Sequence, residues 1–184
     1  MITKYLTIWT QDLLDWLDAL LDRLTSYRLV LYSLYALLAY SLVLSIRGDF
    51  AFTWYQLVRS VIWLVIVCKI ANIFYSRVLN IPRNVESDLI TALILSLIMS
   101  PAATVNDAIA LTAAGFAAMA AKYILTVGGR HIFNPAAIGA VTAGLLLHDY
   151  ASWWVGTNHL FPVIVVAGVL ILRKMKRSVR RQRQ

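Results

Sequence analysis

The sequence predicts an all-α integral membrane protein, with an N-terminal amphipathic helix followed by about six hydrophobic segments, two of them short half-helices. Two observations carry this prediction. Apolar residues make up 60% of the 184 positions and charged residues only 14%, against about a quarter in soluble domains. The charges are also unevenly spread, because seven of the 17 basic residues follow Leu172. The single cysteine, Cys68, excludes a disulfide framework within the chain and a cysteine-based zinc or iron–sulfur site.

Residues 2–26 carry too many charges for a membrane span. Asp12, Asp15, Asp18 and Asp22 recur at helical spacing, and a stripe of apolar residues lies opposite them. The stripe contains Tyr5, Ile8, Trp9, Leu13, Trp16, Leu17, Leu20 and Leu24. This pattern predicts an amphipathic interfacial helix as the first domain, residues 1–26. Its acidic face is either solvated or docked on a basic surface.

Four of the six apolar segments are long enough to cross a membrane. The first three cover residues 29–46, 52–75 and 108–127, and a helix rises about 1.5 Å per residue against a hydrocarbon core about 30 Å thick. Small residues crowd positions 113–121, which allows a neighbouring helix backbone to approach closely. A further span is predicted at 155–172. Together the segments form a transmembrane domain at 27–173.

The remaining two segments, 89–99 and 136–147, are short. Helices of that length cover about 17 Å, roughly half of the hydrocarbon core. Interrupted backbone at membrane depth is tolerated only inside protein or beside a water-filled cavity, and paired interrupted helices often mark a binding site. The alternative is that flanking polar residues extend both helices into full spans.

Basic residues are distributed very unequally between the two sides of a six-crossing topology. One side collects 14 of the 17, and the other collects only Arg47. The side richer in Lys and Arg is normally cytoplasmic, so the pattern predicts a multi-pass inner-membrane protein with both termini in the cytoplasm. The basic tail, 174–184, is expected to touch anionic lipid rather than nucleic acid.

The residues before the two short segments suggest a binding site. Glu86 and Asp88 occupy a predicted first helical turn, where capping alone also explains them. Asn134 precedes Pro135 at the other helix start, directly after Arg130 and His131. Unpaired amides, a guanidinium and an imidazole suit an anion or the oxygen of a reduced quinone or flavin, although a purely structural turn explains them as well. With Lys122, these side chains would line one cytoplasmic vestibule.

Residues 84–95 (NVESDLITALIL), then 100–101 (SP) and 133–137 (FNPAA), resemble the first half of the RnfD and NqrB proteins. These are the flavin-carrying membrane subunits of ion-translocating ferredoxin:NAD and NADH:quinone oxidoreductases. The resemblance covers about residues 52–173. It implies an electron-transfer subunit with two inverted repeats, FMN attached through phosphate to a threonine in a Ser-Gly-Ala-Thr motif, and in some members a quinone or second flavin.

The chain departs from that family pattern in two respects. It has room for only one repeat, and it contains no Ser-Gly-Ala-Thr. The nearest candidate is Thr157 within 153–157 (WWVGT). A single repeat leaves two alternatives: two chains pair with two-fold symmetry to rebuild the missing half, which is our hypothesis, or the sequence is a fragment of a longer gene. Because the chain contains no dinucleotide-binding fingerprint, electrons would come from a soluble reductase or another donor.

The function expected from these observations is a membrane electron-transfer subunit that binds FMN or riboflavin, or a quinone. It would belong to an oxidoreductase, and its electron transfer would be coupled to ion transport. The expected cofactor-binding residues are Arg130, His131, Asn134, Glu86, Asp88, Lys122 and Thr157. The alternative is a small-solute or ion transporter or channel that uses the same half-helix architecture without redox chemistry.

Overall fold

The computed structural model describes residues 16–82, 85–127, 130–148 and 151–181. Within these ranges the chain forms a helix at 16–22 and six longer ones. These are α2 (Ser26–Arg47), α3 (Trp54–Val78), α4 (Val85–Ile98), α5 (Val105–Ile124), α6 (Pro135–Leu147) and α7 (Phe161–Arg181). The prediction of an all-α protein is confirmed. A small hairpin, β1 (Thr126–Val127) with β2 (Arg130–His131), and the 3₁₀ turn η1 (Trp154–Gly156) complete the described elements.

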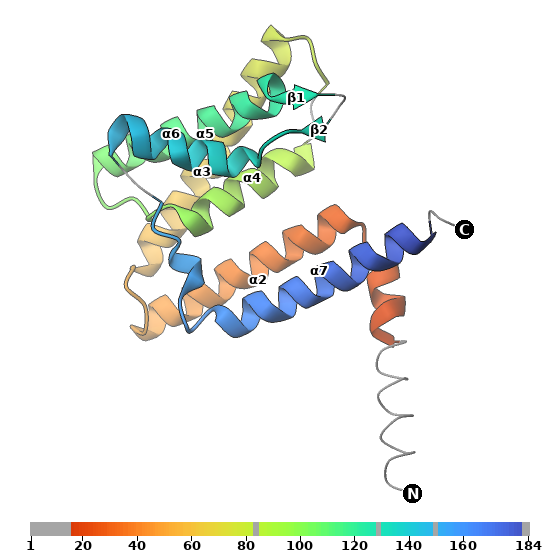
Figure 1. Cartoon of the computed structure of the whole chain (residues 1–184). Coiled ribbons are helices and arrows are strands. Elements are labelled where there is room, and N and C mark those ends of the chain that lie inside the picture. The colour runs from red at the N-terminus through yellow and green to blue at the C-terminus, as the bar shows by residue number, and fades with distance from the viewer. Residues whose placement is uncertain (1–15, 83–84, 128–129, 149–150, 182–184) are drawn as a thin grey trace, which may run out of the picture.

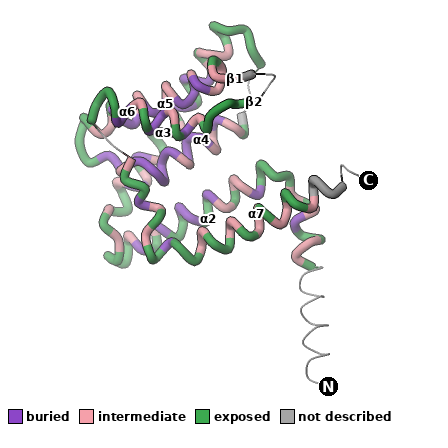
Figure 2. Tube along the Cα trace, viewed as in Figure 1, coloured by how far each residue is buried: buried purple, intermediate pink, exposed green. Residues whose placement is uncertain are grey.

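The helices form two groups (Figure 1). Helices α3, α4, α5 and α6 pack together, while α2 and α7 run side by side below them. Figure 2 shows that buried positions gather where α3 to α6 face one another. Gly139 of α6 lies directly against Ala114 and Ala118 of α5, so the expected close approach at the small residues of 113–121 is confirmed.

Three helices, α2, α3 and α5, are long and apolar enough to cross a membrane. They correspond to three of the four spans predicted from the sequence. Ile62, Ile66 and Ile70 recur at four-residue intervals on α3 and stay 54%, 49% and 53% exposed. Because water would penalise such a row of large apolar side chains, this face of α3 is suited to contact with lipid.

Helices α4 and α6 remain short. Helix α4 begins at Val85, four residues earlier than predicted, and contains 14 residues, and α6 contains 13. At about 1.5 Å per residue each covers roughly 20 Å, still less than the hydrocarbon core of about 30 Å. The flanking polar residues therefore lengthen α4 by one turn without making it a full span.

The end of α4 is held by the segment around η1. Pro101 prevents the helix from continuing, which leaves the last carbonyl groups of α4 without helical partners. The Trp154 indole Nε1 donates to the carbonyl oxygens of Ser96 and Met99, at 3.1 and 2.9 Å. The backbone N–H of Trp153 donates to Ile98 at 3.0 Å. The backbone carbonyl groups at the C-terminal end of α4 are thereby hydrogen-bonded inside the protein.

Two side chains of α3 bind the backbone just beyond this break. Ser60 Oγ accepts from the Ala102 N–H at 2.8 Å, and the Arg59 guanidinium donates to the Ala102 carbonyl oxygen. In the structure, Arg59 supports the irregular backbone between α4 and α5.

The prediction of one continuous span at 155–172 is wrong. Residues 154–156 form η1, and α7 begins only at Phe161. The apolar part of α7, residues 161–172, is therefore about 18 Å long and is followed at once by Arg173. The reason lies in the tertiary structure. Trp153 and Trp154 bind the end of α4, and residues 153–156 are therefore not part of an α-helix. By length and composition, the described residues accordingly contain three candidate spans, α2, α3 and α5.

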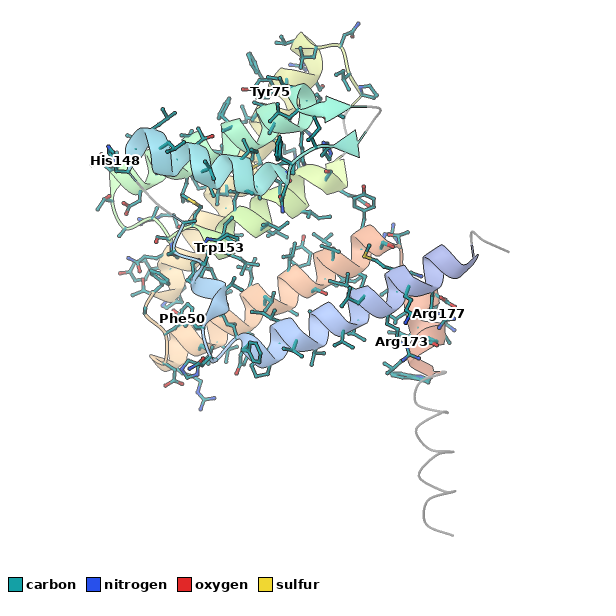
Figure 3. The ribbon with its side chains drawn as sticks, in the orientation of Figure 1. Phe50, Tyr75, His148, Trp153, Arg173 and Arg177 are labelled. Atoms are coloured by element: carbon teal, nitrogen blue, oxygen red, sulfur yellow. The ribbon has the colours of Figure 1, made fainter. Side chains whose placement is uncertain are left out.

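Asp18 and Asp22, the two acidic residues of the helix at 16–22, are paired rather than merely solvated. Asp18 receives a hydrogen bond from Arg173 at 2.6 Å, and Asp22 receives one from Arg177 at 2.9 Å. Arg177 also pairs with Asp18. Figure 3 shows Arg173 and Arg177 beside the short helix at 16–22. The first part of the predicted tail is thus helical and docked on acids of the same chain; residues 1–15 of the predicted N-terminal helix lie outside the described residues.

Hydrogen bonds from Arg173 and Arg177 lower the pKa of Asp18 below its ordinary value. A carboxyl group whose folded-state pKa is lowered contributes stability above its unfolded pKa and loses it as the pH falls through the folded value. We therefore expect helix 16–22 to stay docked on α7 at about pH 4, where an unpaired aspartate is half protonated.

A spin-label distance between Ala19→Cys and Lys176→Cys, both at exposed positions, measures this docking. The wild-type distance should be unchanged between pH 7 and pH 4, and Asp18→Asn should lengthen or broaden it at pH 7. Asp49→Asn removes an exposed pair with Arg47 and serves as the control. A distance that lengthens as wild-type protein is brought to pH 4 would contradict the expectation.

Candidate functional site

A cavity of about 320 Å³ lies at the end of the molecule where α4 begins and the hairpin turns. It is lined by Tyr27, Asn72, Ile81, Pro82, Ser87, Lys122, Tyr123, Thr126 and His131. Both short helices start at this end (Figure 1). The volume falls at the lower end of the range for small-molecule sites, about 300–1,000 Å³.

A buried polar network stands behind the cavity. Asn72 of α3 and Asp88 of α4 are 4% and 7% exposed, and Asn72 Nδ2 donates to Asp88 Oδ2 at 2.9 Å. The Tyr123 hydroxyl at the end of α5 donates to Asn72 Oδ1. Since a buried polar group is costly unless it is hydrogen-bonded, these contacts hold the three side chains in one arrangement. They also tie three helices together at the site.

Lys122 brings a positive charge to the cavity. Its ammonium group donates to the Ser87 carbonyl oxygen in the first turn of α4. An ammonium has three donors, so this contact does not exhaust what Lys122 can offer a ligand. The neighbouring Asp88 carboxylate balances the charge behind the cavity wall.

The hairpin adds an imidazole. Thr126 and His131 are paired positions of β1 and β2, which places His131 Nδ1 3.4 Å from Thr126 Oγ1. The Thr126 hydroxyl donates in turn to the Lys122 carbonyl oxygen at 2.6 Å. The reversal of the chain at 126–131 therefore brings His131 back beside the end of α5.

Three of the residues predicted from the sequence belong to this site. Lys122 and His131 line the cavity, and Asp88 lies one hydrogen bond behind it through Asn72. Charged and imidazole groups that lie far apart along the chain are thus brought together near the start of α4.

The other predicted residues have different roles or positions. Glu86 is exposed and forms a 3.9 Å pair with Arg28, and Asn134 caps α6 through the Ala136 N–H at 3.0 Å. Thr157 lies between η1 and α7, in the segment that binds the C-terminal end of α4, and its Oγ1 is buried without a hydrogen-bond partner. Arg130 belongs to β2, and its side chain lies outside the described residues.

Sequence reasoning missed Asn72, Tyr123 and Thr126. Asn72 offered a signal, because it is an uncharged polar residue inside a 25-residue span, and polar side chains in such helices tend to face the protein interior. Tyr123 and Thr126 offered none, since hydroxyl-bearing residues near a helix end are common in any membrane protein.

A second cavity, about 430 Å³, lies beside the break between α4 and α5. Arg59 is the charged residue in its lining, which otherwise contains Ser60, Trp63, Thr104, Thr112, alanines, Val105 and Ile109. Arg59 and Ser60 both bind the backbone of Ala102. We therefore assign these two side chains a structural role, the support of the segment between α4 and α5.

Comparisons of the chain with protein-family models, curated proteins and solved structures find no match. The candidate site therefore rests on its own geometry. That geometry is a small cavity with an ammonium, an imidazole and two tyrosines, backed by a buried carboxylate at the start of a helix too short to span a membrane.

Proposed function

We propose that this protein is a membrane electron-transfer subunit that binds the ring head of a quinone or flavin in the cavity at Lys122 and His131. In this proposal the protein is a multi-pass inner-membrane protein with both termini in the cytoplasm. Electrons pass between a soluble donor and a membrane acceptor. The observation that carries the proposal is the convergence of Lys122, His131 and the Asp88 network on one cavity.

The cavity suits a small ring head better than FMN. Its volume of about 320 Å³ is at the lower limit for ligand sites, and Lys122 and His131 can bind ring oxygens. The apolar helices α2 and α3 beside it suit a lipid-soluble tail. We therefore favour a quinone over a flavin.

Thr157 does not fit a covalent FMN. Its hydroxyl oxygen is buried, so a phosphate ester there requires the η1–α7 segment to move. It also lies at the other end of the bundle from the Lys122 cavity. Non-covalent binding is therefore the form of the proposal that these residues support, and purified protein would show no flavin fluorescence after denaturing electrophoresis.

The first test is the variant Lys122→Met, which keeps the length of the side chain and removes its charge. Hydrogen bonds to charged groups contribute about 1.5–3 kcal/mol, so affinity for a tailless methylated benzoquinone and its hydroquinone should fall roughly 10- to 100-fold. Equilibrium dialysis of the detergent-purified protein measures this change. The matched control is Lys69→Met, because Lys69 is exposed on α3. Equal affinities of wild type and Lys122→Met would show that the Lys122 ammonium group does not contribute to ligand binding.

The alternative function, a proton- or ion-coupled transporter, has one observation in its favour. Asp88 is buried beside Asn72 and near Lys122, and ionisable residues within membrane helices often mark ion or proton pathways. Proton or solute flux in liposomes without any quinone or flavin binding would favour this alternative.

A further inference from the structure

Arg59 places a positive charge at an exposed position of α3, a helix long and apolar enough to cross a membrane. It lies five residues after Trp54, the first residue of the helix, which is about 8 Å along the axis. Trp54 and Tyr55 are both 53% exposed, as expected of aromatic residues at the level of the lipid headgroups. A long arginine side chain just inside that level can reach the headgroups.

The contact with Ala102 uses a small part of what Arg59 can donate. A guanidinium group has five N–H donors, and Nη2 donates to the Ala102 carbonyl oxygen. None of the ion pairs formed by the described residues includes Arg59. A charge on a membrane helix is costly unless it is paired or hydrated, so this position favours an anionic partner.

The start of α5 does not itself supply an anion site. The carboxylate of Asp107 accepts from the backbone N–H groups of Ala103 and Thr104, at 2.8 Å each. The attraction for an anion at the cavity beside this turn therefore comes from Arg59. The negative charge of Asp107 next to these two lining residues disfavours a small, multiply charged anion such as inorganic phosphate.

The cavity of about 430 Å³ at Arg59 changes in character along its length. Beyond Arg59, α3 contributes Trp63 and α5 contributes Ala108, Ile109 and Thr112. The Trp63 indole donates to Thr112 Oγ1 at 2.9 Å, and the Thr112 hydroxyl donates to the Ala108 carbonyl oxygen at 2.7 Å. Each of these side chains has a single polar hydrogen, so both hydrogens are used within the protein. This part of the cavity therefore offers mainly apolar contact.

An apolar stripe continues from Arg59 along α3. Trp63, Ile66 and Ile70 follow at intervals of four, three and four residues, which is the spacing of one helix face. They are 45%, 49% and 53% exposed. The distance from Arg59 to Ile70 is about 16 Å along the axis, close to the thickness of one leaflet, about half of the 30 Å hydrocarbon core. One charged group is thus followed by an apolar surface one leaflet long.

We infer that the groove between α3 and α5 binds a phospholipid, with its phosphate on Arg59 and an acyl chain along Trp63, Ile66 and Ile70. Guanidinium groups pair with phosphate through two parallel hydrogen bonds, and the apolar stripe matches the chain. A free phosphate lacks the chain, and a diacylglycerol lacks the phosphate. The groove lies near the start of α3, whereas Asn72 and the Lys122 cavity lie near its end, so this lipid site is independent of the proposed function.

Native mass spectrometry of the protein in neutral detergent tests the inference, with dioleoylphosphatidylglycerol and dioleoylglycerol as probes. The two lipids have the same chains and differ in the phosphate headgroup. Because hydrogen bonds to charged groups are strong, we expect phosphatidylglycerol to bind at least tenfold more tightly. Inorganic phosphate in large excess should leave the lipid bound, and displacement would assign the site to free phosphate and overturn the inference.

The variant Arg59→Gln should reduce the difference between the two lipids to less than threefold, and Arg59→Lys should retain an intermediate difference because it keeps the charge. Lys69→Gln is the matched control, since Lys69 is exposed on the same helix but does not line the cavity. It should bind both lipids as the wild type does. Equal losses in Arg59→Gln and Lys69→Gln would indicate general attraction to positive charge and would overturn the inference.

A second variant leaves Arg59 and its support of Ala102 in place. Ala108→Leu narrows the cavity from the α5 side, so affinity for phosphatidylglycerol should fall at least threefold. Ala137→Leu is the control, because Ala137 is exposed on α6 and does not line this cavity.

Two further results would contradict the lipid site. Equal binding of phosphatidylglycerol and diacylglycerol by wild-type protein would show that Arg59 does not hold the phosphate. Unchanged affinity in both Arg59→Gln and Ala108→Leu would place any bound lipid elsewhere on the protein. Neither result bears on the Lys122 cavity, so the proposed function would stand or fall by its own test.

Discussion

Replacing Gly139 with alanine is expected to destabilise the helix bundle by about 1–3 kcal/mol, the usual cost of overpacking a tight contact. A Cβ atom at this position would overlap the backbone carbonyl oxygen of Ala114 and lie 3.0 Å from the Ala118 Cβ. Because the carbonyl oxygen belongs to helix backbone rather than to a flexible side chain, α5 and α6 would have to separate. Their contact depends on small residues that let two backbones meet.

The midpoint of unfolding by SDS in detergent micelles, followed by circular dichroism, measures this effect. Gly168→Ala is the matched control, since a Cβ there meets nothing within 4 Å. Alanine is favoured over glycine inside a helix by about 1 kcal/mol, so the control should be neutral or stabilising. An unchanged midpoint for Gly139→Ala would mean that α5 and α6 do not approach as closely as the structure has them.

The substitution Trp154→Ala is expected to have the largest effect on stability, about 3–5 kcal/mol, as for other buried aromatic residues. The Trp154 side chain is 5% exposed and packs edge to face against Phe50 at 5.5 Å. Its loss would open a cavity and also remove the indole donor from Ser96 and Met99. The carbonyl groups at the end of α4 would then be left unpaired, which carries its own cost.

The same SDS titration applies, and Trp153→Ala provides the control. Both variants lose an indole ring, but the Trp153 side chain is 60% exposed. A retained far-ultraviolet spectrum with a lowered midpoint is the expected result for Trp154→Ala. Equal midpoints for the two variants would contradict the assignment of Trp154 as the cap of α4.

The long apolar segments could be predicted from the sequence because composition and length decide them. Helices α2, α3 and α5 follow runs of apolar residues, and few other structures satisfy backbone hydrogen bonds in lipid. The sixth segment could not be predicted in this way. Its apolar run at 155–172 meets the same criterion, yet the need to cap α4 takes Trp153 and Trp154 out of the helix.

The candidate site was predicted only in part. Lys122, His131 and Asp88 were identified because charged or imidazole groups are rare in such a chain and therefore conspicuous. Glu86 and Asn134 were identified on the same grounds, but they face solvent or cap their own helix. Position along a helix does not reveal which side of it a neighbour will cover.

The sequence by itself determined that the chain is helical, rich in apolar spans and interrupted by two short helices. Those features follow from local composition, chain length and the helix-breaking proline at 101. The tertiary structure alone decided that Asn72 joins Asp88 to Tyr123, that Trp154 closes α4, and that Asp18 and Asp22 bind the start of the basic tail. Each of these contacts joins residues between 16 and 159 positions apart, and such pairings depend on how the helices pack.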